Sequence, residues 1–229
     1  MTDVIVMTGT GTEVGKTIVT AAVAALARAD GKNVAVVKLA QTGIEPGDES
    51  DTDVVRRLSG VTDVHELVRY PEPLAPATAA RRANQRAVPV AELTEQVRAV
   101  AKGRDLVVVE GAGGLLVHLD GDGGTIADVA KSLDAKVVVV AAAGLGTLNA
   151  IALTTEALEH RKIDCLGIVI GSWPAEPDLA AEANLDDVET YAQAPLLGRV
   201  PAGASRLDPA EFREVAQRNL ARVLGGTRD

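Results

Sequence analysis

The sequence predicts an α/β fold of three layers, with a mostly parallel central sheet and helices on both of its faces. Short apolar runs alternate with helical patterns along the chain, as they do when crossover helices connect parallel strands. Several of these runs are continuously apolar, which is typical of strands that are covered on both faces. Glycine-rich turns follow the runs that end near residues 8, 110, 141 and 170. We therefore expect one α/β domain that spans residues 1–229.

The turn at residues 9–17 has the order of a phosphate-binding loop. An apolar strand at 4–7 precedes it, and Lys16 and Thr17 open a helix directly after its last glycine. Glycines let backbone N–H groups approach a polyphosphate, and the helix N-terminus adds free donors and a positive dipole end. Lys16 would contact the outer phosphates, and the Thr17 hydroxyl would bind Mg²⁺. The loop predicts a P-loop NTPase type of fold.

The spacing of this loop departs from the standard pattern, which has a glycine where this chain has Thr10. The turn is therefore longer or shifted. One alternative is a glycine turn that binds nothing, and the other is a dinucleotide-binding fingerprint. The Lys16-Thr17 pair disfavours the first, and a third glycine that comes one residue late disfavours the second.

The composition limits the function classes. The chain has 229 residues, 47% of them hydrophobic, which is ample for a core. A net charge of -9 and an aromatic content of 2% disfavour a nucleic-acid partner. No apolar run reaches the ~18 residues of a membrane span, and we see no signal peptide. The single cysteine, Cys165, excludes an intrachain disulfide and fits a cytoplasmic protein without membrane partners.

The second strand, at 34–37, follows an apolar helix at 18–29 and ends at Lys38. In open α/β sheets, ligands bind beyond the carboxyl ends of the strands. A lysine at a buried strand end is costly unless an anion neutralises it. We therefore interpret Lys38 as a second ligand of phosphate or substrate. A surface lysine that extends its ammonium into water is the alternative.

An acidic loop at 45–53 then leads into a helix. It is either a solvated loop in which Ser50 or Asp51 caps the helix, or the source of a carboxylate for Mg²⁺. The residue types alone do not choose among the candidate carboxylates, which are Asp48, Glu49, Asp51 and Asp53.

The strand at 106–109 ends at Glu110, and glycines follow it at 111, 113 and 114. A carboxylate at this place corresponds to a Walker-B acidic residue, which holds Mg²⁺ directly or through water. An ordinary glycine turn is the alternative.

The remaining periodicities complete the expected fold. Prolines interrupt the region 65–105. We expect strands at 137–140, 165–170 and 196–200, and helices at 77–84, 90–102, 125–133, 150–160 and 176–193. Asp208 caps a final helix whose core face is Phe212, Val215, Ala216, Leu220 and Val223.

Four motifs in combination resemble dethiobiotin synthetase. They are the loop at 9–17, Lys38 with the turn at 41–43, the strand end at 109–114, and the turn at 145–149. The resemblance extends from residue 2 to about residue 212. It implies a homodimeric P-loop ligase with its active site at the subunit interface. The implied reaction closes the ureido ring of dethiobiotin from 7,8-diaminopelargonate, CO₂ and a nucleoside triphosphate. The implied route runs through a carbamate and a carbamic–phosphoric anhydride, in biotin biosynthesis.

The resemblance also implies roles for individual residues. The catalytic residues would be Lys38 and Lys16, and the Mg²⁺ ligands would be Thr17, Asp51 and Glu110. The substrate would be bound by Thr12, Lys38, Thr42, Gly114, Leu145, Gly146, Thr147 and Asn149, with the turn at 145–149 supplied by the partner subunit. The nucleotide would be bound by Glu13, Val14, Gly15, Lys16, Thr17, Ile18, Asp51, Glu110, Gly111, Ala112, Gly113, Gly171, Ser172, Pro201, Ala202 and Gly203.

One departure concerns the nucleotide base. Many members of the family have an adenine-reading asparagine where this chain has Gly171-Ser172. We therefore expect relaxed base choice, with CTP or other triphosphates accepted beside ATP.

A partition- or septum-positioning ATPase of the same fold is the alternative function. Those proteins carry a further lysine early in the loop, at the position of Gly11. A nucleotide-binding module without chemistry is the third possibility.

Overall fold

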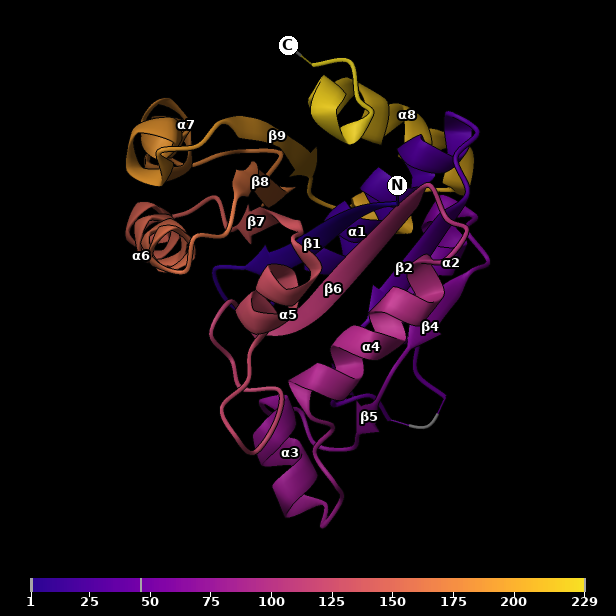
Figure 1. Ribbon diagram of the computed structural model, residues 1–229. Helices are drawn as coiled ribbons and strands as arrows, with labels where there is room; N and C mark the ends of the chain where they lie inside the picture. Colours follow the sequence, from indigo (N-terminus) through magenta and orange to yellow (C-terminus); the bar gives the residue numbers. More distant parts are fainter. Residues whose placement is uncertain (1, 46, 229) are drawn as a thin grey trace.

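The computed structural model describes residues 2–45 and 47–228, and its core is one parallel sheet (Figure 1). Within these residues the sheet has seven strands in the order β4-β2-β6-β1-β7-β8-β9. All neighbouring pairs are parallel. This confirms the predicted fold class. The strands are β1 (Asp3–Gly9), β2 (Val34–Lys38), β4 (Val64–Glu66), β6 (Leu106–Gly114), β7 (Lys136–Ala141), β8 (Cys165–Trp173) and β9 (Leu196–Pro201).

Helices cover both faces of this sheet because side chains on a strand alternate between its two faces. Val36, Val108 and Val138 belong to one core cluster, together with residues of α1 (Lys16–Ala29), α2 (Asp51–Ser59) and α8 (Pro209–Asn219). The strand residues between them belong to a second cluster. This cluster includes residues of α4 (Val90–Ala101), α5 (Ile126–Leu133), α6 (Thr147–His160) and α7 (Leu179–Ala192).

Helix α1 is apolar on all sides because it is enclosed on all sides. Every residue from 19 to 27 is buried, and the helix contacts α2 and α8 as well as the sheet. This burial fixes the carboxyl-terminal end of β1, the glycine loop and the first turn of α1 as one rigid unit.

A small rim module lies beside the main sheet, in the region that the prolines made hard to interpret. It contains the short parallel pair β3 (Gln41–Thr42) and β5 (Arg69–Tyr70), and α3 (Pro76–Arg82). Tyr70 anchors it: its buried hydroxyl donates to Arg86 O at 3.1 Å and accepts from Val88 N at 3.3 Å. The sequence did not predict β3, β4 or β5, because strands of two or three residues show no periodicity.

Several predicted boundaries are wrong by a few residues. β6 continues through Glu110 to Gly114, and β8 continues through Gly171 to Trp173. The glycine-rich end of β6 still pairs with β1, as in Gly9 with Gly114, although the register shifts after Met7 and Gly113 has φ 72°. Helix α1 begins at Lys16, and α6 begins at Thr147, after Gly146 in the left-handed region.

The core face predicted for the last helix needs one correction. Helix α8 ends at Asn219, and Val223 lies beyond it in the 3-10 segment η2 (Arg222–Leu224). Val223 is 54% exposed, whereas Leu224 is buried in its place. Across the two described ranges, no helix is both long and apolar enough to cross a bilayer.

Candidate active site

A cleft of about 820 Å³ lies at the carboxyl ends of the central strands. The glycine loop, the ends of β2 and β6, the start of α2 and the segment before α3 form its walls. The predicted site residues that line this cleft are Thr12, Glu13, Gly15, Lys16, Thr17, Ile18, Lys38, Thr42, Asp51, Glu110, Ala112 and Gly113. Residues that are distant in the sequence therefore meet at one rim, as the strand-end rule predicts.

The glycine loop presents the open end of α1 to this cleft. Gly15 is the N-cap residue, has φ +93° and provides no side chain to satisfy the first N–H groups of the helix. These donors are the unpaired groups that bind anions at helix N-termini. Glu13 also lies in the left-handed region, with φ 57°. The Lys16 ammonium folds back across the loop and donates to Gly11 O at 2.8 Å.

Lys38 lies at the centre of the polar cluster. Its ammonium is 2.5 Å from Asp51 Oδ2 and 2.7 Å from Glu110 Oε1, and it donates to Gly111 O at 3.0 Å. Lys38 is only 5% exposed and Glu110 only 1% exposed. The lysine is therefore buried and ion-paired, which removes the alternative of a solvated surface lysine.

The two lysines of the cleft differ in their electrostatics. Burial lowers the pKa of Lys38, but the nearby carboxylates of Glu110 and Asp51 outweigh burial and raise it above its usual value. Burial lowers the pKa of Lys16, and the positive charge of Lys38 lowers it further. Lys38 is thus held firmly in its charged form.

Thr17 completes a set of oxygen donors around the cluster. Its hydroxyl donates to Glu110 Oε1 at 2.9 Å, the same oxygen that accepts from Lys38. One hydroxyl and two carboxylates suit Mg²⁺, which takes few protein ligands and fills its other positions with water and phosphate oxygens. No group of three or more His, Cys, Asp or Glu that could hold a metal occurs in residues 2–45 and 47–228. One hydroxyl and two carboxylates do not fill a coordination sphere by themselves, so this donor set fits a metal that phosphate oxygens also hold.

The start of α2 selects Asp51 from the acidic loop. Ser50 is the N-cap residue, and Asp53 completes a capping box with it. Glu49 pairs with Arg57 at 2.7 Å, and Asp48 is exposed. Only Asp51 of these four carboxylates lines the cleft.

Gln41 is a cleft residue whose role the sequence reasoning missed. Its side-chain Oε1 accepts the backbone N–H of Asp51 at 3.2 Å, and the residue is only 4% exposed. It thus joins β3 to the first residue of α2. The sequence shows a glutamine in the turn after Lys38. Its hydrogen-bond partner, Asp51, is ten residues away, so no local sequence pattern identifies the pair.

The cleft also has an apolar wall that was not predicted, formed by Ile44, Pro73, Leu74, Pro76 and Val117. Pro73 and Leu74 belong to the loop before α3, and Pro76 is the first residue of that helix.

Other predicted residues lie outside the lining of this cleft. Val14 is buried in the glycine loop, and Gly111 and Gly114 lie on β6 beside the lining residues. Gly146, Thr147 and Asn149 belong to the start of α6, beside Leu145, which is 92% exposed. Gly171 is buried against the glycine loop, and Ser172, Pro201, Ala202 and Gly203 are exposed near the ends of β8 and β9.

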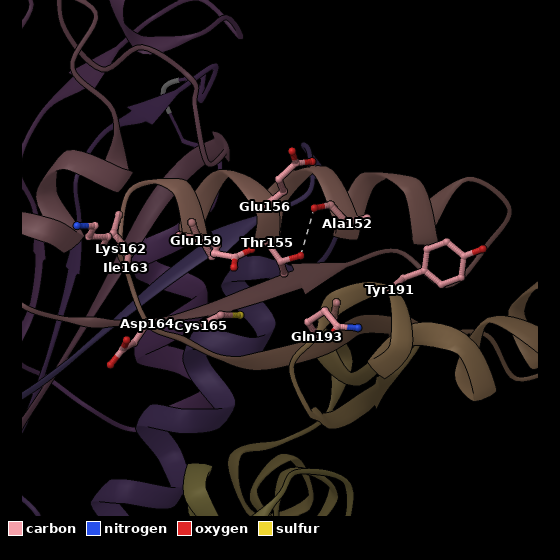
Figure 2. Close-up of a pocket in the computed structure, with 12 residues that line it drawn as sticks. Ala152, Thr155, Glu156, Glu159, Lys162, Ile163, Asp164, Cys165, Tyr191 and Gln193 are labelled. Atoms are coloured by element: carbon pink, nitrogen blue, oxygen red, sulfur yellow. Dashed lines mark hydrogen bonds between the residues drawn. The ribbon is translucent and has the colours of Figure 1, made fainter.

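A second hollow of about 590 Å³ lies elsewhere and contains no predicted site residue. Figure 2 shows it between α6, the end of α7 and the start of β8, with Cys165 on its wall. Cys165 packs against the second core cluster, and burial raises the pKa of its thiol. This thiol is therefore poorly suited to act as a nucleophile, in agreement with a core role.

Together, the parallel sheet, the glycine loop that opens α1, and Glu110 on the strand beside β1 define a P-loop nucleotide-binding protein. A family model described as an AAA domain matches residues 3–209. An ATP-dependent dethiobiotin synthetase BioD of Frankia casuarinae is 60% identical over 223 residues, covering 97% of this chain and 94% of that protein. The synthetase of Streptomyces coelicolor is 56% identical over 226 residues, covering 99% of this chain and 95% of that protein. The chain belongs to the ATP-dependent dethiobiotin synthetase family, as the motifs indicated.

Solved structures of lower identity confirm the fold alone. A septum site-determining protein MinD complexed with Mg-ADP, from Pyrococcus horikoshii, has a TM-score of 0.60 and 16% identity, covering 93% of this chain and 89% of that one. A ParA family ATPase from Chlorobium tepidum has a TM-score of 0.60 and 14% identity, covering 98% and 96%.

Proposed function

We propose that this cleft closes the ureido ring of dethiobiotin from 7,8-diaminopelargonate, CO₂ and ATP. The observation that carries the proposal is the buried Lys38, which lies between Asp51 and Glu110 at the mouth of the phosphate loop. A charged lysine in this place can neutralise an anion that forms next to a bound triphosphate. Full-length similarity to named dethiobiotin synthetases supports the choice of reaction.

The reaction needs three steps. One neutral amine of the diamine first adds to CO₂, loses a proton to water and gives a carbamate. A carbamate oxygen then attacks the γ-phosphorus, the bond from that phosphorus to the bridging oxygen breaks, and ADP leaves with the bond electrons. The second neutral amine finally attacks the carbonyl carbon of the carbamic–phosphoric anhydride, loses a proton, closes the ring and expels phosphate.

In this scheme the two lysines position and neutralise the reacting anions. Lys16 contacts the outer phosphates, and Lys38 lies between the carbamate and the γ-phosphoryl group. Phosphoryl transfer depends mainly on positioning and charge stabilisation, so no histidine base is required. Thr17, Asp51 and Glu110 would hold Mg²⁺, which when bound neutralises charge on the phosphate oxygens.

Other residues in and near the cleft contact the diamine and the base of the nucleotide. Thr12, Thr42 and the backbone at 111–114 contact the diamine. The apolar wall around Leu74 suits its methylene chain, since it offers carbon surface beside the polar cluster. The base lies near Gly171, Ser172 and 201–203; of these residues Gly171 is buried, whereas Ser172 and 201–203 are exposed and can contact the base.

We also propose a homodimer in which the turn at 145–149 reaches the carboxylate of the substrate in the partner's cleft. Leu145 is 92% exposed, Leu153 on α6 is 59% exposed, and Leu179 on α7 is 83% exposed. These large apolar side chains, exposed just before α6, on α6 and at the start of α7, are available for a subunit interface, since α6 and α7 contact each other. Sedimentation as a monomer at all working concentrations would argue against this arrangement. The proposed location in the cell is the cytoplasm, in keeping with the single cysteine.

The test is incubation with the diamine, bicarbonate, Mg²⁺ and ATP, followed by product mass and phosphate release. Dethiobiotin and diamine-dependent phosphate release are expected. Hydrolysis that DNA or lipid stimulates, without the diamine, would instead favour the partition- or septum-type switch. If neither dethiobiotin formation nor stimulated hydrolysis is observed, the result would favour a nucleotide-binding module without chemistry.

A further inference from the structure

The two carboxylates assigned to the metal already share an ion pair with one side chain of the protein. Lys38 Nζ lies 2.5 Å from Asp51 Oδ2 and 2.7 Å from Glu110 Oε1, so one ammonium bridges both groups. Glu110 Oε1 also accepts from Thr17 at 2.9 Å. The three donors proposed for the cation thus form one contiguous network with Lys38.

We propose that Lys38 is the resident counter-ion of the cation site, so that the cleft rejects free divalent cations and takes its metal only together with the nucleotide. This inference rests on the proposed function, because that function assigns Asp51 and Glu110 to the metal.

The geometry makes lysine and metal competitors. Mg²⁺ binds oxygen at about 2.0–2.1 Å. A cation at that distance from the same carboxylate oxygens would lie against the Lys38 ammonium, and the two positive charges repel each other. The lysine must therefore leave these two oxygens before a metal can bind them.

Displacing Lys38 is costly unless another anion receives it. The residue is 5% exposed, and a buried ammonium without a partner carries a large desolvation penalty. A free divalent cation brings no such anion. A nucleotide places phosphates in the glycine loop on the same wall of the cleft, and these phosphates can replace the carboxylates as partners of Lys38.

Lys16 provides a matched comparison. It lines the same cleft and carries the same charge, but its hydrogen bond goes to the neutral carbonyl of Gly11 at 2.8 Å. Its removal frees no carboxylate. Comparing the two variants therefore separates the effect of losing any positive charge in the cleft from the effect of losing the counter-ion of Asp51 and Glu110.

The experiment is titration of the nucleotide-free protein with Mn²⁺, followed by calorimetry and by the spin resonance of free Mn²⁺. Lys38→Met should bind Mn²⁺ roughly 10- to 100-fold more tightly than the wild type, within the usual range of coupling between sites. Lys38→Arg should stay close to the wild type, and Lys16→Met should gain much less than Lys38→Met. Equal affinity of wild type and Lys38→Met, or an equal gain in Lys16→Met, would overturn the proposal.

A second measurement needs no methionine variant. The ammonium signal of Lys38 in ¹⁵N-lysine spectra is assigned by its loss in Lys38→Arg. It should stay in place with Mg²⁺ alone and shift when Mg²⁺ and a non-hydrolysable ATP analogue are present together. An equal shift with Mg²⁺ alone would overturn the proposal. Both measurements omit the diamine, so failure to form dethiobiotin would overturn the proposed function without changing their outcome.

Discussion

Gly171 packs its backbone directly against the backbone of Val14. A Cβ atom at Gly171 would come within 2.1 Å of the Val14 carbonyl oxygen and 2.6 Å of Val140 Cγ1. A Cβ at Gly15 would in turn lie 2.5 Å from the Gly171 carbonyl oxygen. The end of β8 and the phosphate loop therefore touch without intervening side chains. An asparagine side chain at position 171 would require this loop to move.

We expect Gly171→Ala to weaken nucleotide binding. The added methyl group must push the glycine loop away from β8, which displaces the N–H groups of α1 from the phosphates. The affinity for an ATP analogue should fall by roughly tenfold or more, about 1.4 kcal/mol. Gly121→Ala is the matched control, because a Cβ atom at Gly121 would meet nothing within 4 Å and its φ is not in the left-handed region. Wild-type affinity in Gly171→Ala would contradict the packing argument.

The same contact leads to a prediction about base choice. With glycine at 171, no side chain there can read the edge of adenine, and an alanine or asparagine cannot be added without strain. We expect CTP, GTP and UTP to support dethiobiotin formation at rates within about tenfold of ATP, since less than about 1.4 kcal/mol would separate them. A nucleotide panel under single-turnover conditions measures this. Strong preference for ATP over the other three would show that another group reads the base.

Lys38→Ala should reduce turnover by roughly 10²–10³-fold, the usual cost of removing one preorganised charge from a transition state. The fold should persist with reduced stability, because the buried Glu110 loses its ion pair with Lys38 but keeps the hydrogen bond from Thr17. The rate of diamine-dependent phosphate release measures the effect, and circular dichroism checks the fold. Lys38→Arg should recover only part of the rate, because guanidinium geometry differs from that of ammonium. An unaffected rate in Lys38→Ala would remove the residue from the catalytic role.

Gln41→Met should weaken metal binding in the presence of an ATP analogue. The methionine has a similar length but cannot accept the Asp51 N–H, so the first turn of α2 and the Asp51 carboxylate lose a fixed support. Loss of such an outer-shell partner typically costs 10–100-fold in metal affinity or activity, and we expect roughly tenfold here. Mn²⁺ titration measures the change. Gln41→Glu, which keeps an acceptor oxygen, should bind Mn²⁺ more tightly than Gln41→Met. Equal losses in both variants would contradict a positioning role.

The chemistry at the strand ends was predictable because each signal is local. Lys38 and Glu110 each follow a continuous apolar run, and the rule for parallel sheets places the ends of such runs on one rim. The carboxylate of the acidic loop was not fixed by residue type. The capping box at Ser50 and Asp53, the Glu49–Arg57 pair and the Gln41 bond together leave Asp51 to face the cleft. These interactions depend on the tertiary structure, whereas several acidic residues of the loop satisfy the same local sequence pattern.

The rim module could not be predicted from the sequence for a related reason. Its strands β3 and β5 are two residues long, and Tyr70 holds them through backbone atoms of residues 86 and 88. Periodicity cannot reveal contacts of this kind. The apolar wall at Pro73 and Leu74 therefore became visible only when the module was placed against the cleft.

The last prediction concerns Asp120, a buried carboxylate that fixes the start of α4. Burial raises its pKa, but hydrogen bonds from Val90, Gly124 and Asp122 outweigh burial and hold the pKa below its usual value. The bonds from Val90 N and Gly124 N are both 2.8 Å, and that from Asp122 N is 3.1 Å. Because the folded pKa is depressed, the carboxylate contributes stability above the unfolded value of about 3.9, and this contribution is lost as pH falls through the folded pKa.

Asp120→Asn should therefore lower the free energy of unfolding by about 1.5–3 kcal/mol at pH 7, the range for hydrogen bonds to a charged group. The difference from the wild type should shrink as pH falls below about 4. Urea denaturation of both proteins across this range measures it. Asp122→Asn, at the exposed neighbouring carboxylate, is the matched control and should change stability little at any pH. A deficit in Asp120→Asn that stays constant down to pH 3 would mean that the amide disturbs packing, and that the charge of Asp120 does not stabilise the turn.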